Sequence, residues 1–329
     1  MGKATMTTKI EAAKKGEVVK VNFVRVETTE LRKYPMHLLQ SQGSDAKEIV
    51  IRDTDANGKE IIRWRVLFTS PEGSPGALAY RIDRLIIDKC LEAHREVPSV
   101  LRLGTLNEIC DALDIDRTGH NTKNIQTALM QLYGTEIDCD SESTVRFKRF
   151  QWICFTGKKI PETETRADAV YIGLSDPYQK ILSRAGRRPL DYDYLRALPP
   201  AASRFYEVIS SRCFAALQKG GKNSEARLLY SEFTELSALT RHFGGRDVRQ
   251  QMTRIHKPHI ASGYISGVSY DARTDKFGRP DWMMIYTPGE KARREFKAAM
   301  KRGEVQKPGE VIKIKASTAT MRTHETEQV

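Results

Sequence analysis

The stretch SEFTELSALTRHFGGRDVRQQMTRIHKPHIASGYISGVSYDA, residues 231–272, decides the predicted fold because two helical segments in it precede a segment of period two. Ser231 predicts the N-cap of the first helix, and Gly244-Gly245 separates that helix from the second. The second helix is predicted over about 246–262, with Gly263 as its C-cap. Its apolar stripe follows helical spacing and consists of Val248, Met252, Ile255 and His259.

Beyond this helix the hydrophobic period is that of β-strands. Residues 264–270 and 282–286 predict a two-stranded ribbon, joined by a basic loop around Gly278 and Pro280. Helix, turn, helix and ribbon in this order predict a winged helix, in which the second helix enters the DNA major groove. The alternative is an ordinary solvated amphipathic helix. The double glycine, the Arg/Gln/Lys spacing and the basic loop favour DNA binding.

The predicted DNA-binding residues of this module lie opposite the apolar stripe and in the basic loop. The side chains expected nearest base edges, where Arg and Gln form specific hydrogen bonds, are Arg246, Arg249, Gln250 and Thr253. The side chains expected to contact mainly phosphates are Arg241, Arg254, Lys257, Arg273, Lys276 and Arg279.

Composition bounds the class of protein. The chain has 329 residues, 40% hydrophobic and 29% charged, which predicts about two globular domains. Lys+Arg number 54 against 42 Asp+Glu, and the net charge of +12 favours nucleic acid over an anionic membrane surface. We expect no membrane span, since no apolar run approaches ~20 residues. The amino terminus also lacks the apolar region of a secretory signal.

The cysteines predict buried free thiols in a reducing cytoplasm, since none has the CxxC spacing of a zinc site. They are odd in number and widely scattered: Cys90, Cys110, Cys139, Cys154 and Cys213.

A second copy of the same element order is predicted upstream. Asn57-Gly58 predicts a β-hairpin with strands at 48–51 and 61–67, and a helix at 76–95 follows. Thr105 and Glu108 form a capping box that begins the next helix. After a turn at 116–119, Asn121 or Thr122 caps a further helix. A ribbon follows, with strands at 135–139 and 145–155.

This upstream module carries less charge on its second helix. Its candidate DNA contacts are Lys123, Gln126, Thr127, Arg146 and Lys148. The residues leave two interpretations equally open, DNA binding and a dimer interface.

The predicted fold class is therefore α+β, with tandem winged-helix domains. Residues 1–35 are expected to be a flexible arm with a strand candidate at 18–26, and 304–329 a disordered tail. Winged-helix domain 1 is placed at 36–166, and domain 2, the main DNA-reading domain, at 167–303. Within domain 2 the other expected elements are a strand at 169–174 and helices at 176–185, 191–198, 201–217 and 290–302.

We expect no enzyme chemistry: no catalytic residue, no cofactor and no metal. The sequence lacks a GxxxxGK[ST] phosphate loop, an HExxH zinc helix and a GxSxG elbow. His256 and His259 have metal-pair spacing, but we interpret one as packing and the other as facing phosphate. Tyr171 is a candidate nucleophile, although a tyrosine on a strand more often packs.

Three phrases carry a family resemblance: GSPGALAYRIDRLIIDKCLEA (73–93), TLNEICDALDI with NTKNIQTALMQL (105–115 and 121–132), and YIGLSDPYQKILSRAGRRPLDYDYLRALPPAASRFYEVISSRCFAAL (171–217). Over roughly 60–290 the chain resembles the initiators of theta-replicating plasmids, of the replication initiator protein A (RepA) type. The resemblance implies a bacterial protein that binds origin repeats (iterons), melts the adjacent duplex and recruits the host initiator and replicative helicase. It also implies homodimerisation through the first domain and autorepression, a form of copy control.

Two other functions stay open on the residues. One is a winged-helix transcriptional repressor built from the same modules. The other is a strand-nicking replication enzyme acting through a tyrosine.

Overall fold

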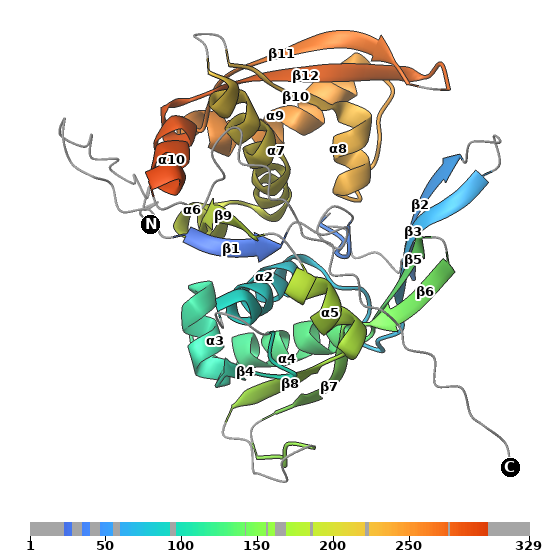
Figure 1. The fold of residues 1–329 in the computed structure, drawn as a ribbon, viewed down its shortest axis with the longest axis vertical. Coiled ribbons are helices and arrows are strands. Elements are labelled where there is room, and N and C mark those ends of the chain that lie inside the picture. The colour runs from blue at the N-terminus through green and yellow to red at the C-terminus, as the bar shows by residue number, and fades with distance from the viewer. Residues whose placement is uncertain are drawn as a thin grey trace, which may run out of the picture.

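The computed structural model describes residues 23–27, 35–39, 47–54, 60–92, 97–141, 143–155, 157–161, 169–184, 187–220, 224–275 and 277–301. These form two lobes, each built from helices and antiparallel strands, as Figure 1 shows. The mixed α+β class is thereby confirmed. The predicted tail at 304–329 lies outside the described residues, as does most of the predicted arm.

The described residues of the first lobe form four helices and two sheets. The helices are α2 (Ala77–Glu92), α3 (Leu106–Leu113), α4 (Gly119–Tyr133) and α5 (Asp176–Arg184). One sheet has the order β2-β3-β5-β6, with strands β2 (Glu48–Thr54), β3 (Glu60–Phe68), β5 (Thr135–Ser141) and β6 (Ser143–Lys148). The other has the order β4-β8-β7, with strands β4 (Val100–Gly104), β8 (Val170–Leu174) and β7 (Phe150–Cys154).

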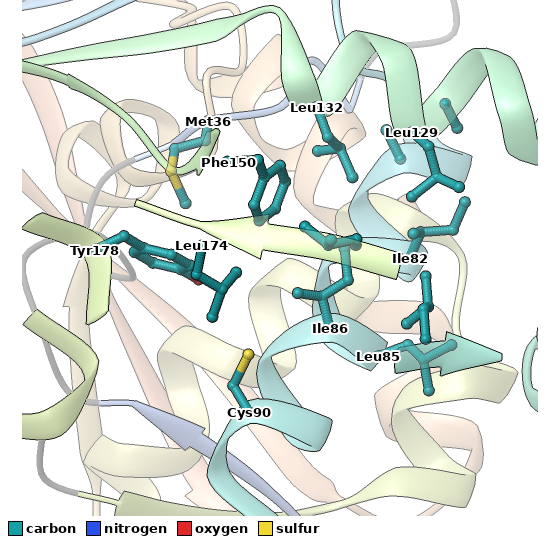
Figure 2. Close-up of a cluster of buried hydrophobic side chains, with 14 of the residues drawn as sticks. Met36, Ile82, Leu85, Ile86, Cys90, Leu129, Leu132, Phe150, Leu174 and Tyr178 are labelled. Carbon is teal, nitrogen blue, oxygen red and sulfur yellow. The ribbon is translucent and has the colours of Figure 1, made fainter. Parts of the chain in front are cut away.

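The core of this lobe forms around α2. Ile82 and Ile86 of α2 are fully buried and face Leu129 of α4, Phe150 of β7 and Leu174 of β8, as Figure 2 shows. Each such side chain contributes about 1.5–3 kcal/mol on burial. The buried apolar side chains of these helices therefore hold the lobe together.

Capping decides where the two helices after β4 begin. The capping box is confirmed: Glu108 N–H donates to the Thr105 hydroxyl at 3.1 Å, and Thr105 N–H donates to the Glu108 carboxylate at 2.6 Å. The predicted cap of α4 at Asn121 or Thr122 is wrong. Thr118 accepts the Asn121 N–H at 3.2 Å, so α4 starts at Gly119.

The strand predicted at 145–155 is two strands in different sheets, and the break lies at Arg149. The Arg149 guanidinium is fully buried and donates to the Asp83 carboxylate of α2. Burial raises the pKa of Asp83, but the charges of Arg149 and Arg84 outweigh burial and hold that pKa below its usual value. Because Arg149 points into the core, the pairing of β6 with β5 ends before it and the pairing of β7 with β8 begins after it.

The predicted boundary between residues 166 and 167 is also misplaced. β8 pairs with β4 and β7, so it belongs to the first lobe. Tyr178 and Leu182 of α5 pack in the same core. The second lobe thus begins after α5.

In the part of the second lobe that the structure describes there are five helices and a three-stranded sheet. Its helices are α6 (Tyr192–Ala197), α7 (Pro200–Lys219), α8 (Tyr230–Leu236), α9 (Gly245–Ala261) and α10 (Glu290–Lys301). The sheet has the order β10-β12-β11, with strands β10 (Ala226–Leu229), β12 (Pro280–Pro288) and β11 (Ile265–Thr274). The sequence missed β10, which has only four residues. It also missed β9 (Arg187–Asp191), which pairs with β1 (Phe23–Glu27).

Buried charged groups join the two lobes. Glu207 of α7 lies 3.0 Å from Arg204 and 3.5 Å from Arg84 of α2, and Arg84 lies 3.0 Å from Asp83. Arg204 also donates two hydrogen bonds, of 2.9 and 2.7 Å, to the carbonyl of Leu236 at the end of α8. A continuous ionic path therefore runs from the core helix of the first lobe to the second.

Four cysteines are buried free thiols, as predicted: Cys90, Cys110, Cys154 and Cys213. None of the described helices combines the length and the apolar content needed to cross a membrane.

Candidate nucleic-acid interface

Helix α9 has one buried and one exposed face. The buried face packs in the core of the second lobe through Val248, Met252, Ile255, His256 and His259. The exposed face carries six polar or basic side chains, Arg246, Arg249, Gln250, Thr253, Arg254 and Lys257, together with the carboxylate of Asp247 in the first turn. All four residues predicted to read base edges thus lie on one solvent-facing surface, as do the two predicted phosphate contacts of this helix.

Both histidines of α9 belong to the buried face, so the interpretation that one of them faces phosphate is wrong. The His256 Nε2 lies 3.0 Å from the Tyr286 hydroxyl, and the His259 Nδ1 lies 2.7 Å from the Tyr194 hydroxyl. Burial lowers the pKa of His256 to about 3 and that of His259 to about 4. Both rings are neutral at pH 7, and the exposed face gains no charge from them.

The start of α9 lies close to the sheet. A Cβ on Gly245 would be in ordinary contact, 3.5 Å, with the Trp282 ring of β12. The helix before the turn is α8, and Ser231 does not cap it as predicted. Instead Asp281 of β12 accepts the Ser231 N–H at 3.0 Å and also its hydroxyl. A buried carboxylate thus ties the first helix of the pair to the hairpin.

The end of α9 confirms the role predicted for Gly263. This residue has φ +69°, a left-handed conformation that glycine adopts without strain. Its N–H donates to the Ile260 carbonyl at 3.0 Å, and the Tyr264 N–H donates to the His259 carbonyl at 2.9 Å. The chain therefore turns at once from α9 into β11.

The loop of the β11–β12 hairpin is organised by Asp275. Its carboxylate accepts the N–H groups of Phe277 and Arg279 at 2.9 Å each, and the guanidiniums of Arg241 at 2.9 Å and Arg279 at 2.8 Å. Partial desolvation raises the pKa of Asp275, but these hydrogen bonds outweigh it and lower that pKa well below its usual value. An Asp followed by Gly278 three residues later is a turn pattern, and it could have revealed this role.

The predicted phosphate contacts in this loop and beside it, at Arg241, therefore differ in their surroundings. Arg241 and Arg279 share one carboxylate, so the three groups together carry a single positive charge. Arg273 is exposed and lies 3.9 Å from Asp271. Lys276 lies outside the described residues. That any of them contacts phosphate stays a prediction.

On α4 of the first lobe, the candidate contacts are partly engaged within the lobe. Lys123 is exposed, while Gln126 is half-buried. The Thr127 hydroxyl donates to the Glu72 carboxylate at 3.3 Å. This surface therefore offers a duplex less charge than α9 does.

The candidate contacts on the ribbon of the first lobe form ion pairs. Arg146 lies 2.7 Å from Asp138 on the neighbouring strand, and Lys148 lies 3.2 Å from Glu136. These pairs offset the charge that the sequence alone assigns to the ribbon. DNA binding and dimerisation by this lobe both stay predictions.

Two features bear on the enzyme alternative: the surroundings of Tyr171 and groups of side chains that could hold a metal. Tyr171 lies on β8 and packs beside Cys154 and Ile160. In the part of the chain that the structure describes, no group of three or more His, Cys, Asp or Glu side chains is arranged to hold a metal ion.

Comparison with known proteins gives the following result. No family model matches the chain, and no curated protein matches it. Among solved structures, the chain is similar to domains 2 and 3 of RctB at 10% identity and TM-score 0.47, over 76% of this chain and 94% of that one. A further structure of RctB domains 2–3 gives 11% identity and TM-score 0.40, over 80% and 97%.

The Pi initiator protein in complex with iteron DNA gives 9% identity and TM-score 0.46, over 65% of this chain and 91% of that one. The resemblance to replication initiators stated from the sequence thus recurs among solved structures. At these TM-scores the similarity does not decide the function of this chain.

Proposed function

We propose that this protein is a non-enzymatic initiator of plasmid replication that binds repeated origin sites, or iterons, in the bacterial cytoplasm. In this proposal both lobes are winged helices, and α9 of the second lobe reads the DNA sequence. Origin melting, recruitment of the host initiator and replicative helicase, homodimerisation and autorepression complete the proposal, and they rest on the family resemblance alone.

One observation carries the DNA-reading part of the proposal, namely the exposed face of α9. Arg and Gln side chains recognise guanine and adenine edges in the major groove, which is wide enough to admit a helix. Arg246, Arg249 and Gln250 lie exposed in the first two turns of α9. In helix-turn-helix proteins the residues near the start of the second helix are those that reach base edges.

The order of elements in the second lobe supports the winged-helix assignment. α7, β10, α8, α9, β11 and β12 follow one another, and β12 lies between β10 and β11 in the sheet. The first lobe repeats α2, β4, α3 and α4 in the same order, with β8 pairing to β4. The β2-β3-β5-β6 sheet is then an addition to the first module.

Selection of bound duplexes from a random DNA pool tests this function with the whole protein. We expect a defined sequence motif, with binding that weakens steeply as salt increases because phosphate contacts release counterions. Recovery of unselected sequences only would contradict sequence-specific binding.

Footprinting of the selected motif in the DNA next to the gene separates an initiator from a repressor. Tandem direct repeats beside an A·T-rich tract support the initiator. A single palindrome supports the repressor instead.

The nicking alternative is tested with supercoiled plasmid DNA and Mg²⁺ or Mn²⁺. The proposal predicts that the DNA stays supercoiled. A nicked product that Tyr171→Phe abolishes would establish the enzyme and overturn the proposal.

A further inference from the structure

Two exposed phenylalanines lie beside the start of α9. The described residues include three large hydrophobic side chains that are strongly exposed: Phe243 at 48%, Phe277 at 61% and Ile260 at 49%. Phe243 comes directly before the Gly244-Gly245 turn, and Phe277 lies in the hairpin loop. The Arg279 guanidinium lies 4.9 Å from the Phe277 ring centre and 5.8 Å from that of Phe243. The rings and the guanidinium thus form one cluster.

The chemistry of this cluster is mainly apolar. The charge of Arg279 is shared with Asp275, which also binds Arg241. A guanidinium that already binds a carboxylate has fewer donors left for a phosphate. Apolar side chains beside an arginine are instead the means by which proteins enter the DNA minor groove.

The loop is also tied to the segment that precedes α9. Asp275 accepts N–H groups of the loop and the Arg241 guanidinium from that segment, so the loop lies next to the start of the helix. Gly278, at φ +73°, completes the turn. A helix seated in a major groove would therefore bring the loop onto the same duplex. This coupling favours duplex DNA over a separate single strand as the partner of the cluster.

We propose that Phe277 enters the minor groove next to the major-groove site of α9, with Phe243 and Arg279 against the groove walls. The proposal rests on the proposed function, because it requires α9 to bind a duplex. It adds a second recognition element, which reads the width and deformability of the flanking base pairs. A·T-rich flanks that contain TA steps should be preferred. TA steps unstack easily around an apolar wedge, and a narrow A·T minor groove attracts an arginine.

The test compares wild type, Phe277→Ala and Ile260→Ala, all in the full chain, on the selected duplex with A·T-rich or G·C-rich flanks. Ile260 is the matched control because it is similarly exposed, at the other end of α9. We expect Phe277→Ala to lose about tenfold in affinity on the A·T-flanked duplex, the effect of one lost aromatic contact. Its salt dependence should be unchanged, because no phosphate contact is removed. Ile260→Ala should bind as wild type does.

Hydroxyl-radical footprinting supplies the second measurement. Wild type should protect the flanking minor groove, and Phe277→Ala should lose that protection. Both proteins should still protect guanine N7 in the major-groove site of α9 from dimethyl sulfate. Unchanged affinity and footprint for Phe277→Ala would overturn the inference and leave the proposed function intact. A loss confined to single-stranded DNA would also overturn it. If wild type binds no specific duplex, both proposals fail together.

Discussion

Lys257 and Arg249 lie on the same exposed face of α9, but their surroundings differ. Arg249 stacks over the Tyr270 ring of β11 at 5.8 Å, which limits the directions its guanidinium can take. Lys257 lies one turn from the end of the helix and is exposed. Such a difference is expected between a side chain that reads bases and one that only neutralises phosphate.

Lys257→Ala is expected to weaken binding to specific and random duplexes by similar factors. The slope of log affinity against log salt should fall by about 1, because one phosphate contact is lost. Equilibrium binding over a series of salt concentrations measures this slope. A selective loss on the specific site, with an unchanged slope, would assign Lys257 to base reading instead.

At the scale of elements, the β11–β12 hairpin is hydrogen-bonded to α8 and to the segment before α9. Asp281 of β12 accepts two hydrogen bonds from Ser231 at the start of α8, and Asp275 binds Arg241 before α9. The sequence could not show this, because a capping carboxylate 50 positions away leaves no local pattern. Local signals predicted the helix ends correctly where the cap is local, as at Thr105 and Gly263.

Asp281→Ala should lower the free energy of unfolding by about 1–3 kcal/mol, because the Ser231 N–H and hydroxyl lose their acceptor in a buried site. Chemical denaturation measures the change. Asp281→Asn keeps one acceptor oxygen and should lose less. Equal stability of the alanine variant and wild type would show that Asp281 does not hold α8.

The buried face of α9 also predicts a dependence of stability on pH. The pKa values of His256 and His259 are lowered by burial to about 3 and about 4, whereas an unfolded histidine titrates near 6.5. As pH falls below about 6.5 the unfolded chain takes up protons that the folded chain does not. The free energy of unfolding should therefore fall by up to about 1.4 kcal/mol per pH unit for each histidine.

Denaturation at a series of pH values between about 7 and about 5.5 measures this slope, above the range where most carboxylates titrate. A His256→Gln, His259→Gln variant should show a shallower slope than wild type, whatever its stability at pH 7. The slope that remains should include a contribution from His37, because burial also lowers the pKa of this residue to about 3. Identical slopes would contradict the buried, neutral state of the two rings.

At the scale of the molecule, the two lobes share a buried ionic path from Asp83 through Arg84 and Glu207 to Arg204. The element order of each lobe follows local periodicity, and the sequence predicted most of it. The predicted lobe boundary failed because β8 and α5 follow the first ribbon yet pack back into the first core. The single strand predicted at 145–155 also includes Arg149, whereas this residue is buried beside Asp83 and separates two strands.

Glu207→Ala should lower the free energy of unfolding by about 3–5 kcal/mol, because it leaves two arginines buried without this carboxylate. Arg212→Ala is the matched control, since it breaks a partly exposed ion pair with Glu232 and should cost only about 0–1 kcal/mol. Chemical denaturation compares the two variants. Similar, small losses for both would show that the path contributes little to joining the lobes.

Sequence reading by the exposed face of α9 is tested by selecting duplexes from the random pool with the Arg249→Ala variant. We expect a selected motif that has lost its base preference at one position and kept the others. Affinity for the wild-type motif should fall by about 1–3 kcal/mol. An unchanged motif and unchanged affinity would contradict the claim.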